Sequence, residues 1–155
     1  MRALRELLDL HALPDSSGGK DTNGTVLIIG GPPSCPGATM LAGIAALRLG
    51  SGRVQLVVHP EVAAATGTAV PETKVLAWDQ ASTPPADVRS AIGVADVVIV
   101  GSGHADMDDG VVAAIAASVD DAFLVLDAGA LRAMKASPAS ATASCWHRTP
   151  TRRVG

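Results

Sequence analysis

The chain is poor in aromatic residues and carries no excess of positive charge. Its 155 residues include two Trp, one Phe and no Tyr, and the formal net charge is -3. A surface on which nucleobases stack needs aromatic side chains, and a phosphate backbone needs a basic face. These two absences argue against nucleic acid as a partner.

Cysteine pairs, a secretion signal and long apolar runs are also missing. Cys35 and Cys145 lie far apart and form no C-x-x-C pair, which is typical of a cytosolic protein with reduced thiols. The start, MRALRELLDLHAL, is broken by Glu6 and Asp9, and no run is long enough to cross a membrane. We therefore expect a cytoplasmic protein with no membrane partner.

What the sequence does contain is an alternation of short apolar runs and small-residue helical patterns. Runs such as TVLIIGG are continuous and β-branched, as in strands buried on both faces of a parallel sheet. The predicted strands cover residues 25–31, 53–58, 74–78, 96–103 and 122–127. The predicted helices cover residues 1–13, 37–52, 60–67, 84–95 and 108–119. This alternation predicts an α/β fold of three layers with a mostly parallel sheet.

The last twenty residues differ from the rest. From residue 136 the sequence ASPASATASCWHRTPTRRVG has neither a strand nor a helix period. We expect one domain over residues 1–135 and an irregular tail over residues 136–155.

Three of the predicted strands end in residues suited to a ligand. Gly30 and Gly31 follow the first strand, Gly101 to Gly103 the fourth and Asp127 the fifth. Ligands of open parallel sheets bind at the carboxyl ends of strands, where glycines allow close approach and helix N-termini favour anions. A nucleotide site that also includes Gly37 is one interpretation, and ordinary tight turns are the other. Asp127 could hold a ligand or cap the next helix.

The common phosphate motifs are absent. Gly30, Gly31 and Gly37 do not have G-x-G-x-x-G spacing, and Pro36 stands where a P-loop has its second glycine. The four histidines lack the spacing of metal ligands. Cys35 has no base nearby in the sequence, so we interpret it as a small filler residue.

A longer stretch of the sequence is more informative than these short motifs. The stretch from Gly18 to Val62 resembles the NAD(P)H-hydrate dehydratase family, which belongs to the carbohydrate-kinase-related, ribokinase-like superfamily. The matching residues are Lys20, Gly24, Val26-Leu27, Gly30-Gly31, Pro36-Gly37-Ala38, Ala46-Leu47-Arg48 and Gly50-Ser51-Gly52. Val70-Pro71-Glu72, ADVVIVGSG and VLDAGAL match later family segments. The resemblance covers about residues 12 to 135 and implies the N-terminal part of a ribokinase-like fold.

The resemblance implies a function in metabolite repair. Members of the family are lyases that dehydrate (S)-NADH or (S)-NADPH hydrate with hydrolysis of ADP or ATP and with Mg²⁺, and they are homo-oligomers. Carried over residue by residue, it assigns substrate contacts to Ala38, Gly101 and Gly103, and no metal ligand. Three departures stand out: Ser102 replaces a proline, His104-Ala105 replaces Leu-Gly, and Gly129 replaces an aspartate.

The family's catalytic half has no counterpart here. It holds a Thr-Pro-His segment, a nucleotide loop and a Gly-x-Gly-Asp motif whose aspartate is the base. This sequence has Thr149-Pro150 followed by Thr151, and no Gly-x-Gly-Asp. We therefore expect a chain truncated at its C-terminus and inactive by itself.

A frameshift is our hypothesis for the tail. If Ser144 to Pro150 are encoded by GC-rich codons, a shifted frame encodes Val-Leu-Ala-Pro-His-Ala, close to the family's Val-Leu-Thr-Pro-His-Pro. The shift would lie near residues 136–143. Coding DNA that lacks a Gly-x-Gly-Asp segment downstream in the other frame would refute it.

Two other functions stay open at this point. The chain could be a non-catalytic nucleotide-binding module, which binds NADH or AMP without turnover. It could also be a small-molecule kinase of the same superfamily, although that leaves the Pro-Gly-Ala and Ala-Leu-Arg matches unexplained.

Overall fold

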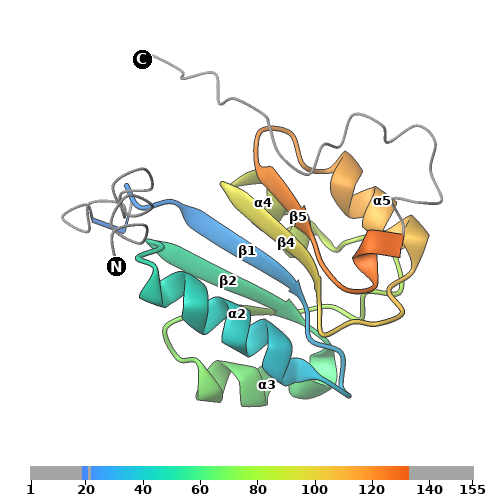
Figure 1. Cartoon of the computed structure of the whole chain (residues 1–155), viewed down its shortest axis with the longest axis horizontal. Coiled ribbons are helices and arrows are strands. Elements are labelled where there is room, and N and C mark those ends of the chain that lie inside the picture. The colour runs from blue at the N-terminus through green and yellow to red at the C-terminus, as the bar shows by residue number, and fades with distance from the viewer. Residues whose placement is uncertain (1–18, 21, 133–155) are drawn as a thin grey trace, which may run out of the picture.

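Five strands alternate with four helices, α2 to α5, in the described part of the chain. The computed structural model describes residues 19–20 and 22–132 (Figure 1). The strands are β1 (Thr25–Gly30), β2 (Arg53–Val58), β3 (Lys74–Ala77), β4 (Val97–Ser102) and β5 (Phe123–Leu126). The helices are α2 (Pro36–Arg48), α3 (Pro60–Ala69), α4 (Ala86–Gly93) and α5 (Asp109–Ala117).

The five strands form one sheet in the order β3-β2-β1-β4-β5, and every pairing is parallel. The chain builds outward from β1 to β3, then crosses to the other side of β1 for β4 and β5. The order therefore reverses between β1 and β4. In doubly wound sheets, the carboxyl ends of the two strands at this reversal form the ligand crevice.

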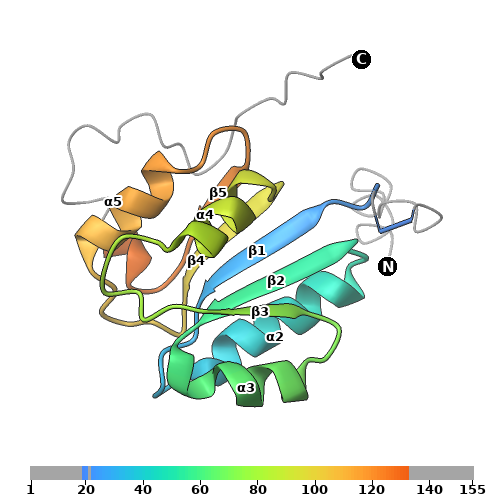
Figure 2. The same cartoon turned by 180° about the vertical axis from the view of Figure 1, so that it is seen from behind.

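Helices lie on both faces of the sheet, so the protein has three layers (Figures 1 and 2). On one face, Ile28 and Leu56 pack with side chains of α2 and α3. On the other face, Leu27 and Ile29 pack with side chains of α4 and α5. Leu27, Ile28 and Ile29 are all fully buried. The continuous apolar run of β1 thus reflects a strand covered on both sides.

The predicted α/β class and strand order along the chain are confirmed, with small shifts at element ends. The predicted helix 84–95 begins at Ala86 because Pro85 is an extended N-cap residue. The fifth strand ends at Leu126, one residue before Asp127. The helix predicted over residues 1–13 and the tail 136–155 lie outside the described residues. Within the described part of the chain, no helix is long and apolar enough to span a membrane.

Candidate functional site at the β1–β4 switch point

The loops after β1 and β4 are joined directly at the reversal of the sheet. The backbone N–H of Gly31 donates to the carbonyl of Ser102 at 3.0 Å. The fully buried Thr39, from the first turn of α2, donates its Oγ1–H to the same carbonyl at 3.1 Å. A Cβ added at Gly30 would lie 2.3 Å from that oxygen, so only glycine permits this approach. These bonds fix the two loops and the start of α2 as one unit.

Ala38 and Gly103, two of the predicted substrate contacts, meet at this point. Gly103 has a φ of +77°, and a Cβ there would lie 3.0 Å from the Cβ of Ala38 and 2.6 Å from the carbonyl of Cys35. The Pro-Gly-Ala segment and the glycine loop after β4 are therefore in van der Waals contact. The sequence separates them by 65 positions, and the parallel pairing of β1 with β4 brings them together.

The N-terminus of α2 faces this junction without a side-chain cap. Its N-cap residue is Cys35, no side chain hydrogen-bonds to the first turn, and that turn contains no acidic residue. Free N–H groups and the helix dipole at such an end attract an anion. By contrast, the first turn of α5 is capped by Asp108 and contains Asp109. Cys35 is exposed, which contradicts its interpretation as a filler residue.

Gln80, which was not predicted from the sequence, hydrogen-bonds to the last residue of β1. Gln80 is 4% exposed, and its Nε2 donates to the carbonyl of Gly30 at 2.7 Å. Its φ of 57° is left-handed, a strained conformation for a residue other than glycine. Thr39 was missed as well. Neither side chain stands out in the sequence, because Gln80 lies in a polar loop and Thr39 among small residues.

Backbone hydrogen bonds also join the loops that follow β4 and β5. The N–H of Asp127 donates to the carbonyl of Val100 at 2.8 Å, and the N–H of Gly129 donates to that of His104 at 2.9 Å. A Cβ at Gly129 would lie 2.4 Å from the carbonyl of His104, so no side chain fits there. The loop that carries His104 thus requires the glycine that stands in place of the family's aspartate.

Asp127 lies at this same edge, at the end of β5. Its side chain is exposed, and Oδ1 accepts the N–H of the next residue, Ala128, at 2.8 Å, just before the helical turn that begins at Ala130. Gly37 is also exposed, with nothing within 4 Å of a Cβ built on it. All seven predicted residues therefore lie at the carboxyl edge of the sheet, and Gly30, Gly31, Ala38 and Gly103 form its centre.

Charged groups are scarce around the centre of the site. No cluster of three His, Cys, Asp or Glu side chains that could hold a metal occurs within residues 19–20 and 22–132. The pKa of His104 is lowered, because burial disfavours the charged ring more than nearby Asp106 favours it. The described residues thus offer glycine backbone and a helix N-terminus, which suit a phosphate-bearing ligand better than acid–base chemistry.

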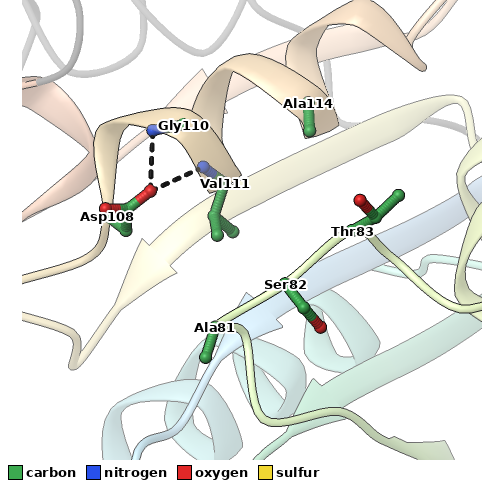
Figure 3. Close-up of a pocket in the computed structure, with 7 residues that line it drawn as sticks. All are labelled: Ala81, Ser82, Thr83, Asp108, Gly110, Val111 and Ala114. Carbon is green, nitrogen blue, oxygen red and sulfur yellow. Dashed lines mark hydrogen bonds between the residues drawn. The ribbon is translucent and has the colours of Figure 1, made fainter.

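A separate cavity of about 220 Å³ lies between the loop after β3 and the start of α5 (Figure 3). Ala81 to Thr83 form one wall, and Asp108, Gly110 and Val111 form the other. Figure 3 shows the Asp108 carboxylate bonded to the N–H groups of Gly110 and Val111, at 2.9 and 3.1 Å. Since these donors are taken and the cap is acidic, this helix end does not suit an anion.

Comparison with known proteins agrees with the site. The family model of NAD(P)H-hydrate dehydratase matches residues 26–147, which cover all the elements described above except Thr25, the first residue of β1. The chain belongs to the NAD(P)H-hydrate dehydratase family. The resemblance inferred from the glycine, Pro-Gly-Ala and Ala-Leu-Arg segments is thereby confirmed.

The dehydratase relatives are longer than this chain. An ADP-dependent (S)-NAD(P)H-hydrate dehydratase of Xanthomonas campestris is 37% identical over 131 residues, which are 80% of this chain and 45% of the relative. This chain therefore spans less than half of that dehydratase.

Solved structures confirm the ribokinase-like fold. An ADP/ATP-dependent NAD(P)H-hydrate dehydratase of Bacillus subtilis, co-crystallised with ATP and Mg²⁺, is similar with a TM-score of 0.60 and 26% identity, over 76% of this chain and 41% of that one. A ribokinase-like superfamily protein of Enterococcus faecalis has a TM-score of 0.68 at 20% identity, over 79% and 43% of the two chains. The second likeness supports the fold alone.

Proposed function

We propose that this chain binds (S)-NAD(P)H hydrate at the β1–β4 switch point, as the substrate-binding part of an ADP- or ATP-dependent dehydratase. The observation that carries the proposal is the contact of Gly103 with Ala38 beside the uncapped N-terminus of α2. The backbone of the loop after β4 lies close to the start of α2 there, and the N–H groups at the N-terminus of α2 can donate hydrogen bonds to a negatively charged group. The names of the relatives supply the identity of the ligand.

The relatives are named as ADP-dependent and ADP/ATP-dependent dehydratases, and one was co-crystallised with ATP and Mg²⁺. We therefore include a nucleoside di- or triphosphate and Mg²⁺ in the proposal. The described residues do not fit a protein-held Mg²⁺, because they contain no cluster of three potential ligands. Mg²⁺ commonly reaches such enzymes bound to phosphates and few carboxylates. We therefore assign both to the part of the relatives that this chain does not match, and assign no step to them here.

The side chains at the centre of the site support binding of hydrated NAD(P)H by the 155-residue chain without its dehydration. Glycine, alanine, threonine and serine meet at the centre of the site, and none of them is a general acid or base at neutral pH. Asp127 is the sole carboxylate among the predicted site residues, and it is exposed and engaged with its own turn. Binding without turnover is the result we expect.

Calorimetry and a turnover assay test the two parts separately. The purified chain should bind hydrated NADH saturably and form no NADH from it in the presence of ADP or ATP and Mg²⁺, while the Xanthomonas relative turns over in the same assay. Failure to bind hydrated NADH refutes the assignment of the site. Formation of NADH by the chain alone refutes the second part and leaves the first standing.

A further inference from the structure

The peptide bond between Gly30 and Gly31 is held at both of its polar groups. Its carbonyl oxygen, on Gly30, accepts the Nε2–H of Gln80 at 2.7 Å. Its N–H, on Gly31, donates to the carbonyl of Ser102 at 3.0 Å. The two groups point in opposite directions from one planar trans unit. The loop after β3 and the end of β4 therefore hold this peptide from opposite sides.

The backbone alone does not hold this peptide in place. Glycine adopts left- and right-handed conformations about equally well, so no side chain opposes rotation of a Gly-Gly peptide. The next carbonyl, that of Gly31, accepts the N–H of His59 at 3.1 Å, which is a bond between backbone groups. The carbonyl of Gly30 instead depends on the side chain of Gln80. Loss of that side chain would free one end of the peptide.

Rotation of this peptide would reach the start of α2. It would turn the N–H of Gly31 away from the carbonyl of Ser102, which also accepts the Oγ1–H of Thr39 at 3.1 Å. Thr39 is fully buried and lies in the first turn of α2. The orientation of one peptide is thus linked, through a shared acceptor, to the helix end that faces the site.

Gln80 occupies its position in spite of two unfavourable features. Its φ of 57° is left-handed, and its Oε1 is buried with no hydrogen-bond partner among the described residues. The carbonyl of Gly30 can only accept, so the amide nitrogen must face it and the amide oxygen is left unpaired. Strained backbone persists where surrounding contacts determine it, and it is concentrated at ligand sites. The bond to Gly30 is the contact that compensates here.

We propose that Gln80 is a positioning residue of the hydrate-binding site, a role that rests on the proposed function. Its amide fixes the Gly30–Gly31 peptide in the orientation that allows the junction with Ser102 and Thr39 to form. That junction holds the uncapped first turn of α2 against the glycine loop after β4. Gln80 acts through the peptide and not on the ligand itself.

Hydrogen exchange and calorimetry on the full chain test this with Gln80→Met. Methionine is similar in length and removes both the donor to Gly30 and the unpaired oxygen. We expect faster exchange of the Gly31 amide, followed by NMR, and about fivefold weaker binding of hydrated NADH, as for the loss of one hydrogen bond. Affinity is measured at a temperature at which every variant is folded, so a purely structural role leaves it unchanged.

Two further variants separate the hydrogen bond from backbone strain and from stability. Gln80→Asn suits a left-handed backbone better but is one methylene too short to keep the bond, so it should weaken binding to a similar extent. Thr66→Val removes a buried side-chain bond to the carbonyl of Val62, 2.8 Å long and within α3. It should lower stability and leave both Gly31 exchange and affinity unchanged.

The possible results separate this inference from the proposed function. Slow Gly31 exchange or unchanged affinity in Gln80→Met would overturn the positioning role while the wild-type chain still binds. An equal loss of affinity in Thr66→Val would overturn it as well, because affinity would then follow stability. A wild-type chain that does not bind hydrated NADH overturns the proposed function, and with it the link from Gln80 to the ligand.

Discussion

Single glycines determine how closely the two loops of the site approach. Gly103 has a left-handed φ of +77°, and a Cβ there would lie 2.6 Å from the carbonyl of Cys35. We expect Gly103→Ala to lower the free energy of unfolding by about 1–3 kcal/mol and to weaken binding of hydrated NADH. Urea denaturation and calorimetry measure the two effects.

Gly37 provides the control for this prediction. It lies in the first turn of α2, which lies beside Gly103, and a Cβ built there meets nothing within 4 Å. Gly37→Ala should change stability by less than about 1 kcal/mol, in the stabilising direction, because it restricts the unfolded chain. Equal losses from the two substitutions would contradict a role for close approach at Gly103.

The lowered pKa of His104 gives the site a pH dependence. Below the unfolded pKa of about 6.5, the unfolded chain takes up a proton that the folded protein resists. Stability from this group is therefore complete above that pH and falls as pH decreases towards the folded pKa. Chemical denaturation at a series of pH values should show a loss between neutral and mildly acidic pH that is smaller in His104→Gln. An unchanged profile in the variant would exclude His104 as the source.

Helix N-termini in this protein divide into capped and uncapped ends. Asp108 caps α5, while Cys35 offers no side-chain hydrogen bond to α2. We expect Cys35→Asp to stabilise the protein by about 0.5–1 kcal/mol as a cap and helix-dipole partner, and to weaken nucleotide binding through charge repulsion. Thermal denaturation and calorimetry report the two changes. Cys35→Ala is the control, and tighter binding by the Asp variant would contradict an anion site at α2.

The elements were largely predictable because local chemistry specifies them. The strands are short, mostly apolar runs rich in valine, leucine and isoleucine, and Pro36 and Pro60 open α2 and α3 at their first positions. The contact between Ala38 and Gly103 was predictable only through the family resemblance, because it depends on β4 crossing to the far side of β1. Gln80 could not be found, since its role arises from a single long-range hydrogen bond to Gly30.

The exposure of β5 shows the same limit for a whole strand. Phe-Leu-Val-Leu resembles the buried runs of β1 and β4 in composition, and the sequence predicts a strand there correctly. Whether Phe123 and Val125 are buried depends on what covers them, which is a property of the surrounding layers. A strand can therefore be predicted from its own residues, while its accessible surface cannot.

For the molecule as a whole, β5 ends the strand order of the described sheet and exposes Phe123 and Val125, which predicts self-association. Exposed apolar edges template pairing with other chains. We expect the purified chain to associate in a concentration-dependent manner in sedimentation velocity experiments, and Val125→Lys to shift it towards monomer. The substitution changes the net charge from -3 to -2, because it adds one positive charge, so greater net repulsion cannot explain the shift. Leu41→Lys makes the same charge change at a side chain on α2 that is 69% exposed, and should leave association unchanged. Equal effects of the two lysines would place the associating surface elsewhere than β5.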